Sequence, residues 1–142
     1  MKAAYSTPAL HVKDIARSIH FYSLLGLELI DFEGDRSCPF WARMRGEGGD
    51  IMFLLAEEPV DPHRQGIFLY LYTPDLPALR EHLLANGVTV SKINRPPYMQ
   101  SGEISVPDPD GYGVFVGHWS DKEHQAWLKS LEAKRKAGLL PG

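Results

Sequence analysis

The sequence contains one pattern twice, and this duplication limits the folds that are open to the chain. The segments TPALHVKDIARSIHFYSLLGLEL and FLYLYTPDLPALREHLLANGVTV each run from a strand-like stretch through an aspartate to a helical stretch that ends at glycine. Asp14 and Gly26 in the first copy correspond to Asp75 and Gly87 in the second, with an offset of 61 residues in both pairs (75 − 14 and 87 − 26). We therefore expect two similar modules.

Each copy predicts one helix surrounded by short strands. The aspartate suits an N-cap, the glycine suits the position after the last helical turn, and apolar residues recur between them at helical spacing. The expected strands after each helix are Leu27–Phe32, Phe40–Met44 and Asp50–Ala56 in the first copy, and Val88–Ile93, Glu103–Val106 and Tyr112–His118 in the second. The predicted fold class is α+β, with two tandem βαβββ modules (5–58 and 66–118) in one domain, 1–119.

The remaining residues, 120–142, predict a separate C-terminal helix and tail. Ser120 and Glu123 have the S-x-x-E spacing of a capping box, and Gly138 ends the helical stretch. One face of this helix is apolar and is expected to pack on the domain or on a partner subunit. That face consists of Trp127, Leu128 and Leu131.

Composition and charge argue against several classes of function. Apolar residues at 44% and charged residues at 23% are ordinary for a soluble globular protein, and a net charge of −3 lacks the basic footprint of a nucleic-acid-binding protein. No secretory signal is evident, and no apolar run approaches the ~20 residues of a membrane span. The single cysteine, Cys38, cannot form an internal disulfide. We expect a cytoplasmic protein with no nucleic-acid partner and no membrane association.

Two motifs in this duplicated frame, HVKDIARSIHFYSLLGLEL and DPDGYGVFV, resemble the vicinal oxygen chelate superfamily over about residues 5–118. This superfamily contains glyoxalase I, extradiol dioxygenases, fosfomycin-resistance enzymes and bleomycin-resistance proteins. The resemblance implies paired modules with a cleft between two curved sheets. In the enzymes it also implies a divalent metal that acts as a Lewis acid, held by His, Glu or Gln from the first and last strands of each module.

The positions that the resemblance assigns to these metal ligands carry other residues here. They are Thr7 and Phe68 in the first strands, Phe115 after the DPDG turn, and Leu54 by the 61-residue offset, or Met52 or Phe53 in another register. A threonine hydroxyl is at most a weak, neutral ligand for a divalent ion. We therefore expect no bound metal and no other cofactor.

The predicted cleft offers aromatic surface instead. Strand alternation places three aromatic side chains of the second module on one face of a strand and aliphatic side chains on the other. Phe115 would add an apolar wall, with room beside it at Gly113 and Gly117, and in the first module His11 shares with Thr7 the face that should line the cleft. The candidate ligand-binding residues are Thr7, His11, Phe68, Tyr70, Tyr72 and Phe115.

Two classes of function remain. The sequence looks most like the bleomycin-resistance branch, whose members bind the antibiotic without a protein-bound catalytic metal, typically as dimers with clefts at the subunit interface. The leading hypothesis is a metal-independent homodimer that sequesters an aromatic or cationic small molecule, such as an antibiotic. The alternative is a glyoxalase- or dioxygenase-type lyase or isomerase, with non-standard metal ligands or with His11 and no metal. The sequence leaves open whether modules pair within one chain or between two.

Overall fold

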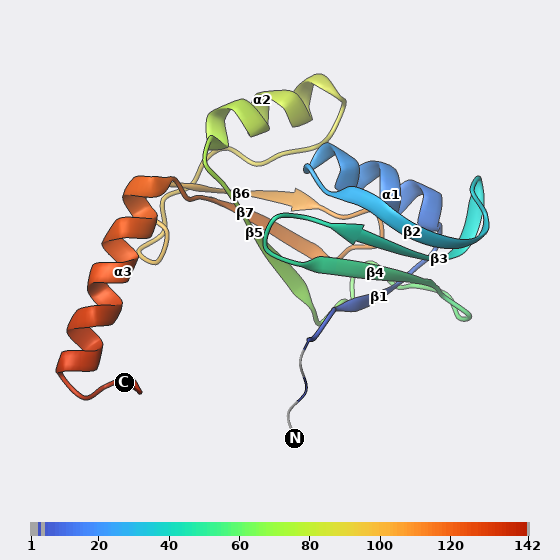
Figure 1. The fold of residues 1–142 in the computed structure, drawn as a ribbon. Helices are drawn as coiled ribbons and strands as arrows, with labels where there is room; N and C mark the ends of the chain where they lie inside the picture. The colour runs from blue at the N-terminus through green and yellow to red at the C-terminus, as the bar shows by residue number, and fades with distance from the viewer. Residues whose placement is uncertain (1–2, 4, 142) are drawn as a thin grey trace.

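The computed structural model describes residues 3 and 5–141, which form two small sheets that each carry one helix (Figure 1). The first module contains β1 (Ala9–Val12), α1 (Ile15–Leu24), β2 (Glu28–Asp35), β3 (Cys38–Arg45) and β4 (Asp50–Leu55). The second contains β5 (Phe68–Thr73), α2 (Leu76–Ala85), β6 (Glu103–Pro107) and β7 (Gly113–His118), and α3 (Asp121–Lys136) follows it. The predicted α+β fold class and the C-terminal helix are confirmed.

The three strands of the second sheet have the same order as their counterparts in the four-stranded first sheet. The strand order is β1-β4-β3-β2 in the first sheet and β5-β7-β6 in the second, and β1 and β5 each pair in parallel with the last strand of their own module. The helix of each module begins and ends as predicted. The side chains of Asp14 and Asp75 each accept a hydrogen bond from the backbone N–H three residues on, at 3.2 and 3.1 Å, and Gly26 and Gly87 follow with φ of 94° and 75°.

Strand alternation decides which face of each sheet becomes core. In β1, β4 and β7 every second residue is apolar and buried beneath the helices, while the residues between them lie on the opposite face. The buried strand residues include Leu10, Val12, Phe53, Val114 and Val116. In β5 the aliphatic residues pack against this core, so the aromatic residues are left on the open face.

The strand expected at Val88–Ile93 is wrong. The segment runs beside β6, where the Ser91 backbone N–H donates to the Ser105 carbonyl at 3.0 Å, and an isolated bridge between Asn94 and Glu103 follows it. The Ser91 carbonyl oxygen accepts a hydrogen bond from the Arg80 guanidinium at 2.9 Å, and the Ser91 hydroxyl accepts the backbone N–H of the facing strand. Because a helix side chain takes the ladder acceptor, the period-2 pattern of this segment does not produce a regular strand.

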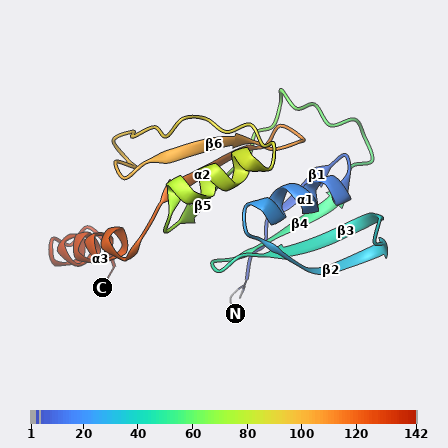
Figure 2. The ribbon, with the colours of Figure 1, turned by 90° about the horizontal axis from the view of Figure 1, so that it is seen from above.

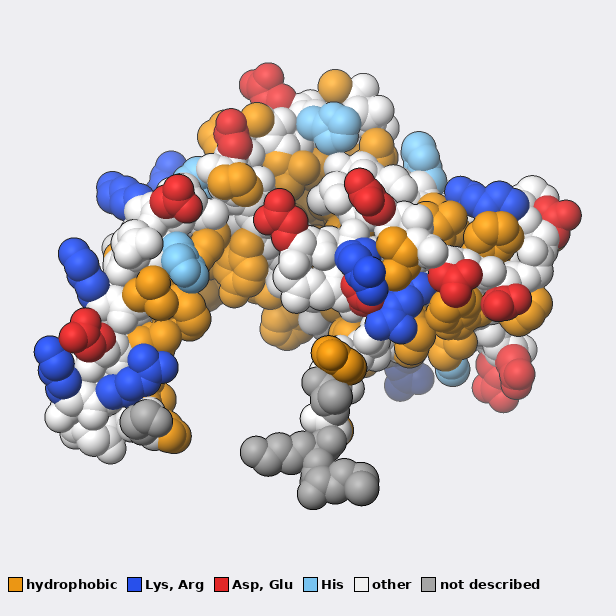
Figure 3. Space-filling model, viewed as in Figure 1, with side chains coloured by type: hydrophobic (Ala, Val, Ile, Leu, Met, Phe, Trp, Pro, Cys, Tyr) orange, Lys and Arg blue, Asp and Glu red, His pale blue; other side chains and the backbone are white. Residues whose placement is uncertain are grey.

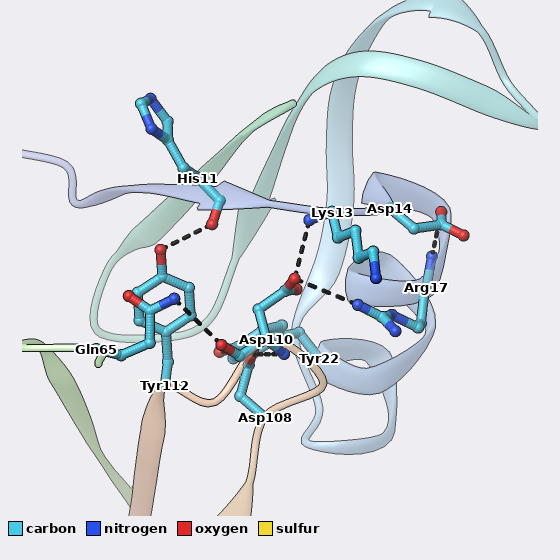
Figure 4. Close-up of polar contacts among 9 residues, drawn as sticks. All are labelled: His11, Lys13, Asp14, Arg17, Tyr22, Gln65, Asp108, Asp110 and Tyr112. Carbon is cyan, nitrogen blue, oxygen red and sulfur yellow. Dashed lines mark hydrogen bonds and ion pairs between the residues drawn. The ribbon is translucent and has the colours of Figure 1, made fainter. Parts of the chain in front are cut away.

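The Asp-Pro-Asp-Gly turn between β6 and β7 joins the two modules (Figure 4). Asp110 is buried, and its carboxylate accepts the backbone N–H of Lys13 at 2.9 Å and pairs with the Arg17 guanidinium at 3.2 Å. Both partners lie at the start of α1, where the helix dipole also favours a negative charge. A turn of the second module therefore binds the N-terminal end of the first module's helix.

A second pair of contacts crosses the same junction. The Tyr22 hydroxyl donates to the Asp108 carboxylate at 2.7 Å, and the Tyr112 hydroxyl donates to the backbone carbonyl of His11 at 2.7 Å (Figure 4). Burial raises the pKa of the Tyr22 phenol, and the nearby Asp108 charge raises it further, so the phenol keeps its proton and remains a donor. These contacts hold the modules in one fixed relation.

The modules lie side by side, with both helices on the same side of the molecule (Figures 1 and 2). A cleft between two paired sheets was expected from the resemblance, with the pairing left open between one chain and two. Within one chain this does not occur, because the two open faces lie next to each other. His11 is exposed on the first sheet, and Phe68 and Tyr72 are 62% and 59% exposed on the second.

The C-terminal helix α3 projects from the end of the second sheet (Figure 1). Its predicted capping box is present: the Ser120 hydroxyl and backbone N–H both bond to the Glu123 carboxylate. The helix buries none of its residues, and Trp127 and Leu128 remain 45% and 42% exposed. On the chain's own domain, this face makes a ring contact between Trp127 and Trp119, at 6.2 Å between the ring centroids. In the part of the chain that the structure describes, no helix has both the length and the apolar character needed to cross a membrane.

Candidate ligand-binding site

Four aromatic side chains form a contiguous surface on the open side of the second sheet, which we call the aromatic face: Phe68, Tyr70, Tyr72 and Phe115. The parallel register places Tyr70 opposite Phe115, and their rings lie 6.2 Å apart at an interplanar angle of 12°. The rings of Phe68 and Phe115 are 5.6 Å apart, and those of Tyr70 and Tyr72 are 5.3 Å apart. The structure thus brings together the four aromatic residues that were predicted from the sequence.

The row of rings continues beyond the sheet. The Tyr72 ring lies 5.6 Å from the Trp119 ring, and the Trp119 ring lies 6.2 Å from Trp127 on α3. Trp119 immediately follows β7 and was not among the predicted site residues. The row of rings that begins with the aromatic face therefore continues through Trp119 to Trp127 in the first half of α3.

A buried carboxylate lies within the aromatic face. Glu103, in β6, is only 7% exposed and accepts hydrogen bonds from the hydroxyls of Tyr70 and Tyr98, the latter at 2.7 Å. Glu103 was not among the site residues predicted from the sequence. The sequence feature that could have identified it is the alternation in GEISV. The two aliphatic residues of this segment face the core, which leaves Glu103 and Ser105 on the open side.

The two tyrosines are donors to this carboxylate. Burial raises the pKa of the Tyr70 phenol, and the hydrogen bond to Glu103 raises it further. The hydrogen bond to Glu103 is the main cause that raises the pKa of Tyr98. Both phenols therefore stay protonated near neutral pH and direct their O–H groups at the carboxylate. A carboxylate beside the negative faces of aromatic rings attracts a cation.

The glycines beside Phe115 do not leave the open room that was expected from the sequence. A Cβ atom on Gly117 would lie 2.8 Å from the terminal carbon of Met99 and 3.1 Å from the Tyr70 ring. A Cβ atom on Gly113 would lie 3.0 Å from the Cβ of Phe68. The expectation is wrong because neighbouring side chains occupy this space, and the glycines allow them to approach β7 closely.

His11 lies in a different place from the aromatic face. It lines an open cavity of about 1030 Å³ that is bounded by strands of the first module, the segment linking the modules and Tyr112 of the second module. None of the four aromatic-face residues lines this cavity. Within one chain, the predicted site residues thus fall into two groups on two adjacent open faces.

Thr7 is engaged by a positive charge. Its hydroxyl oxygen accepts a hydrogen bond from the Arg43 guanidinium at 3.1 Å, and the same guanidinium pairs with Asp50 at 2.7 Å. A divalent cation next to this guanidinium would meet like-charge repulsion. The surroundings of Thr7 therefore disfavour a metal at the first of the positions that the resemblance assigns.

The strand register identifies the fourth of those positions. In the second sheet, Phe115 lies two residues beyond the partner of Phe68. Continuing the register of β1 and β4 back to Thr7, the equivalent of Phe115 in the first sheet is Met52 and not Leu54. A thioether is a soft ligand that suits neither Mg²⁺ nor Mn²⁺. Among residues 3 and 5–141, no three His, Cys, Asp or Glu side chains are grouped to hold a metal ion. The residues at these positions do not fit the superfamily's divalent metal.

Solved structures with the same fold include proteins that bind antibiotics. A bleomycin-binding protein in complex with bleomycin is 16% identical, with a TM-score of 0.66, and the match covers 83% of this chain and 100% of that one. TnmS3, an antibiotic binding protein from Streptomyces sp. CB03234, is 21% identical, with a TM-score of 0.61 and coverage of 82% and 98%. The fosfomycin resistance protein FosX from Listeria monocytogenes, in complex with Mn(II) and a dihydroxypropylphosphonic acid, is 15% identical, with a TM-score of 0.66 and coverage of 90% and 99%.

The sequence itself carries the family assignment. None of the curated proteins compared with the chain matches it. The family described as the Glyoxalase/Bleomycin resistance protein/Dioxygenase superfamily matches residues 5–116, which is more than half of the chain. On this match, and with the fold in agreement, the chain belongs to the Glyoxalase/Bleomycin resistance protein/Dioxygenase superfamily.

Proposed function

We propose that this protein binds a small cationic molecule with a planar group, such as an antibiotic of the bleomycin type, on its aromatic face and without a protein-bound metal. The observation that carries the proposal is the buried Glu103 carboxylate within a surface of exposed and half-buried aromatic rings. Such a surface provides both stacking area and a fixed negative charge.

Each part of the surface has a role in this proposal. The near-parallel rings of Tyr70 and Phe115 present flat area on which a planar ligand group can stack. A cation over such rings gains about 0.5–2 kcal/mol per contact, the upper value applying where water is excluded. Glu103 adds a charge that cannot move away, because two tyrosine hydroxyls hold it. The combination favours cationic planar molecules over neutral or anionic ones.

The structural neighbours support an antibiotic as the class of ligand. Two of the proteins with this fold bind antibiotics: the bleomycin-binding protein, whose structure contains bleomycin, and the antibiotic binding protein TnmS3. The poor fit of Thr7, Met52, Phe68 and Phe115 to a divalent metal supports binding that needs no protein-bound metal.

We also propose that the complete cleft forms between two chains. One chain leaves the aromatic face and the His11 cavity on adjacent open faces, and neither covers the other. A homodimer in which each first sheet lies over the partner's second sheet would bring His11 and Thr7 opposite the aromatic rings. The ligand would then be enclosed on both sides, as is usual for small-molecule sites.

Replacing Tyr70 and Tyr72 together by alanine is expected to weaken bleomycin binding at least tenfold. The double variant loses the ring surface on which the ligand stacks. We expect this loss to reduce the binding free energy by about 1.4 kcal/mol or more, which corresponds to a factor of ten in Kd. The measurement is a titration of the purified protein with bleomycin, followed by tryptophan and tyrosine fluorescence. Tyr5→Ala is the control, because this side chain is 94% exposed and far from β5 in sequence. No saturable change in the wild type, or equal affinity in the double variant, would count against the proposal.

A further inference from the structure

We infer that α3 is a dimerisation arm that holds the first module of a second copy of this chain. The inference rests on the homodimer of the proposed function and specifies the element that forms it. Three observations carry it: the fixed base of the helix, its uncovered apolar face, and an excess of basic residues on α3 that matches an excess of acidic residues on the distant strand β2.

The base of α3 is fixed to the second module. The backbone N–H of Trp119 donates to the carbonyl of Thr73 at 2.8 Å. The His118 ring nitrogen Nδ1 accepts the backbone N–H of Leu76 at 3.3 Å, and its Nε2 lies 3.8 Å from the Glu123 carboxylate in the first turn of α3. These contacts, together with the capping box, set the direction in which the helix leaves the sheet.

The face that α3 turns toward the rest of the molecule is apolar and uncovered. A helix of 16 residues spans about 24 Å, and none of its residues is buried. Figure 3 shows a hollow between α3 and the rest of the molecule, with hydrophobic side chains along it. Because the helix extends so far beyond the aromatic face, a small molecule bound there would leave most of this apolar face in water. A protein surface is the occupant that fits its length.

Charge identifies the protein surface. The second half of α3 carries four basic residues and one acidic residue: Lys129, Glu132, Lys134, Arg135 and Lys136. Strand β2, at the edge of the first sheet, carries four exposed acidic residues and no basic one: Glu28, Asp31, Glu33 and Asp35. In Figures 1 and 2, α3 and β2 lie at opposite ends of the molecule, so these charges cannot meet within one chain.

Two copies can satisfy this pattern symmetrically. If the arm of each chain reaches β2 of the other, the same contact is made twice about a two-fold axis and the assembly closes as a dimer. The apolar faces of the two arms would then be covered, and opposite charges would set the orientation of the chains.

The test is the mass of the protein in solution, measured by sedimentation velocity. The wild type is expected to be a dimer, and Trp127→Asp with Leu128→Asp is expected to weaken dimerisation at least tenfold. Ala126→Asp with Ala133→Asp adds the same charge to the opposite face of the helix and is expected to leave the dimer unchanged. Because α3 buries no residue in its own chain, none of these variants should unfold the protein, and circular dichroism checks this.

A charge exchange tests the choice of partner surface. Reversing Lys134, Arg135 and Lys136 to glutamate should weaken the dimer, and adding Asp31→Lys, Glu33→Lys and Asp35→Lys should restore it. If the α3 charge reversal weakens the dimer and the β2 substitutions do not restore it, β2 is not the partner surface. If the dimer persists in Trp127→Asp with Leu128→Asp, α3 is not a dimerisation arm.

A wild type that remains a monomer at about 100 µM would contradict both the role of α3 and the homodimer itself, because even a Kd of 1 µM gives a dimer at that concentration. The bleomycin titration would still decide ligand binding separately.

Discussion

Gly111→Ala is expected to lower the free energy of unfolding by about 3 kcal/mol, a large effect for the addition of a single methyl group. Gly111 ends the turn that joins the modules and has a φ of +85°, which costs about 1–2 kcal/mol for a residue with a side chain. Its Cβ would also lie 2.5 Å from the Cα of Pro62 and would overlap the Pro62 carbonyl group. Forcing an atom into such a packed place costs typically 1–3 kcal/mol.

Urea unfolding followed by circular dichroism measures this effect. Gly48→Ala is the matched control, because a Cβ there meets no atom within 4 Å and the residue lies in an exposed hairpin. The control should change stability by less than about 1 kcal/mol. If both variants were equally stable, the turn at Asp108–Gly111 would not be the junction that the structure describes.

Glu103→Gln is expected to weaken the binding of cationic bleomycin by about 30-fold, or roughly 2 kcal/mol, which is typical for the loss of a charged hydrogen-bonding partner. The substitution keeps the shape of the side chain and removes its charge. It also replaces one acceptor of a tyrosine hydroxyl by an amide NH₂ group, so that one of Tyr70 and Tyr98 must reorient. Isothermal titration calorimetry at low salt measures the change in Kd.

Ser105→Ala is the control for this variant, because Ser105 lies two residues along β6 on the same open side and carries no charge. Its affinity should remain within a factor of about three of the wild type, since neutral surface changes rarely exceed ±0.5 kcal/mol. The thermal midpoint of each variant shows whether the site is still folded. A folded Glu103→Gln variant with unchanged affinity would mean that the ligand is held by stacking alone.

Much of the fold could be predicted because its signals are local. The caps of both helices, the glycines that end them and the apolar side of each strand are each set by a few neighbouring residues. The prediction of a strand at Val88–Ile93 was wrong for a non-local reason. The Ser91 carbonyl oxygen, which would accept a hydrogen bond in a regular sheet, accepts one from Arg80 on α2. The equivalence of Phe115 with Met52 likewise needed the pairing of β1 with β4, which the 61-residue offset does not contain.

In the candidate site, too, the features set by local sequence could be predicted, and those set by distant contacts could not. Alternation in β5 is a local pattern, and it placed Phe68, Tyr70 and Tyr72 on one surface. The contact between Tyr70 and Glu103 joins residues 33 positions apart, and no pattern within either strand indicates it. The separation of His11 from the aromatic rings also depends on how the modules are joined, because the side-by-side arrangement follows from the turn contacts of Asp108 and Asp110.

The most direct test of ligand binding on the aromatic face is a titration of ¹⁵N-labelled protein with bleomycin, followed by the backbone amide and tryptophan indole NMR signals. The predicted result is that the largest shifts occur in β5, β6 and β7 and at the indole of Trp119, with smaller shifts near His11. The titration should give the same result after treatment with a chelator. Shifts confined to the cavity at Leu54–Gln65, or no saturable shifts at all, would contradict the proposed site.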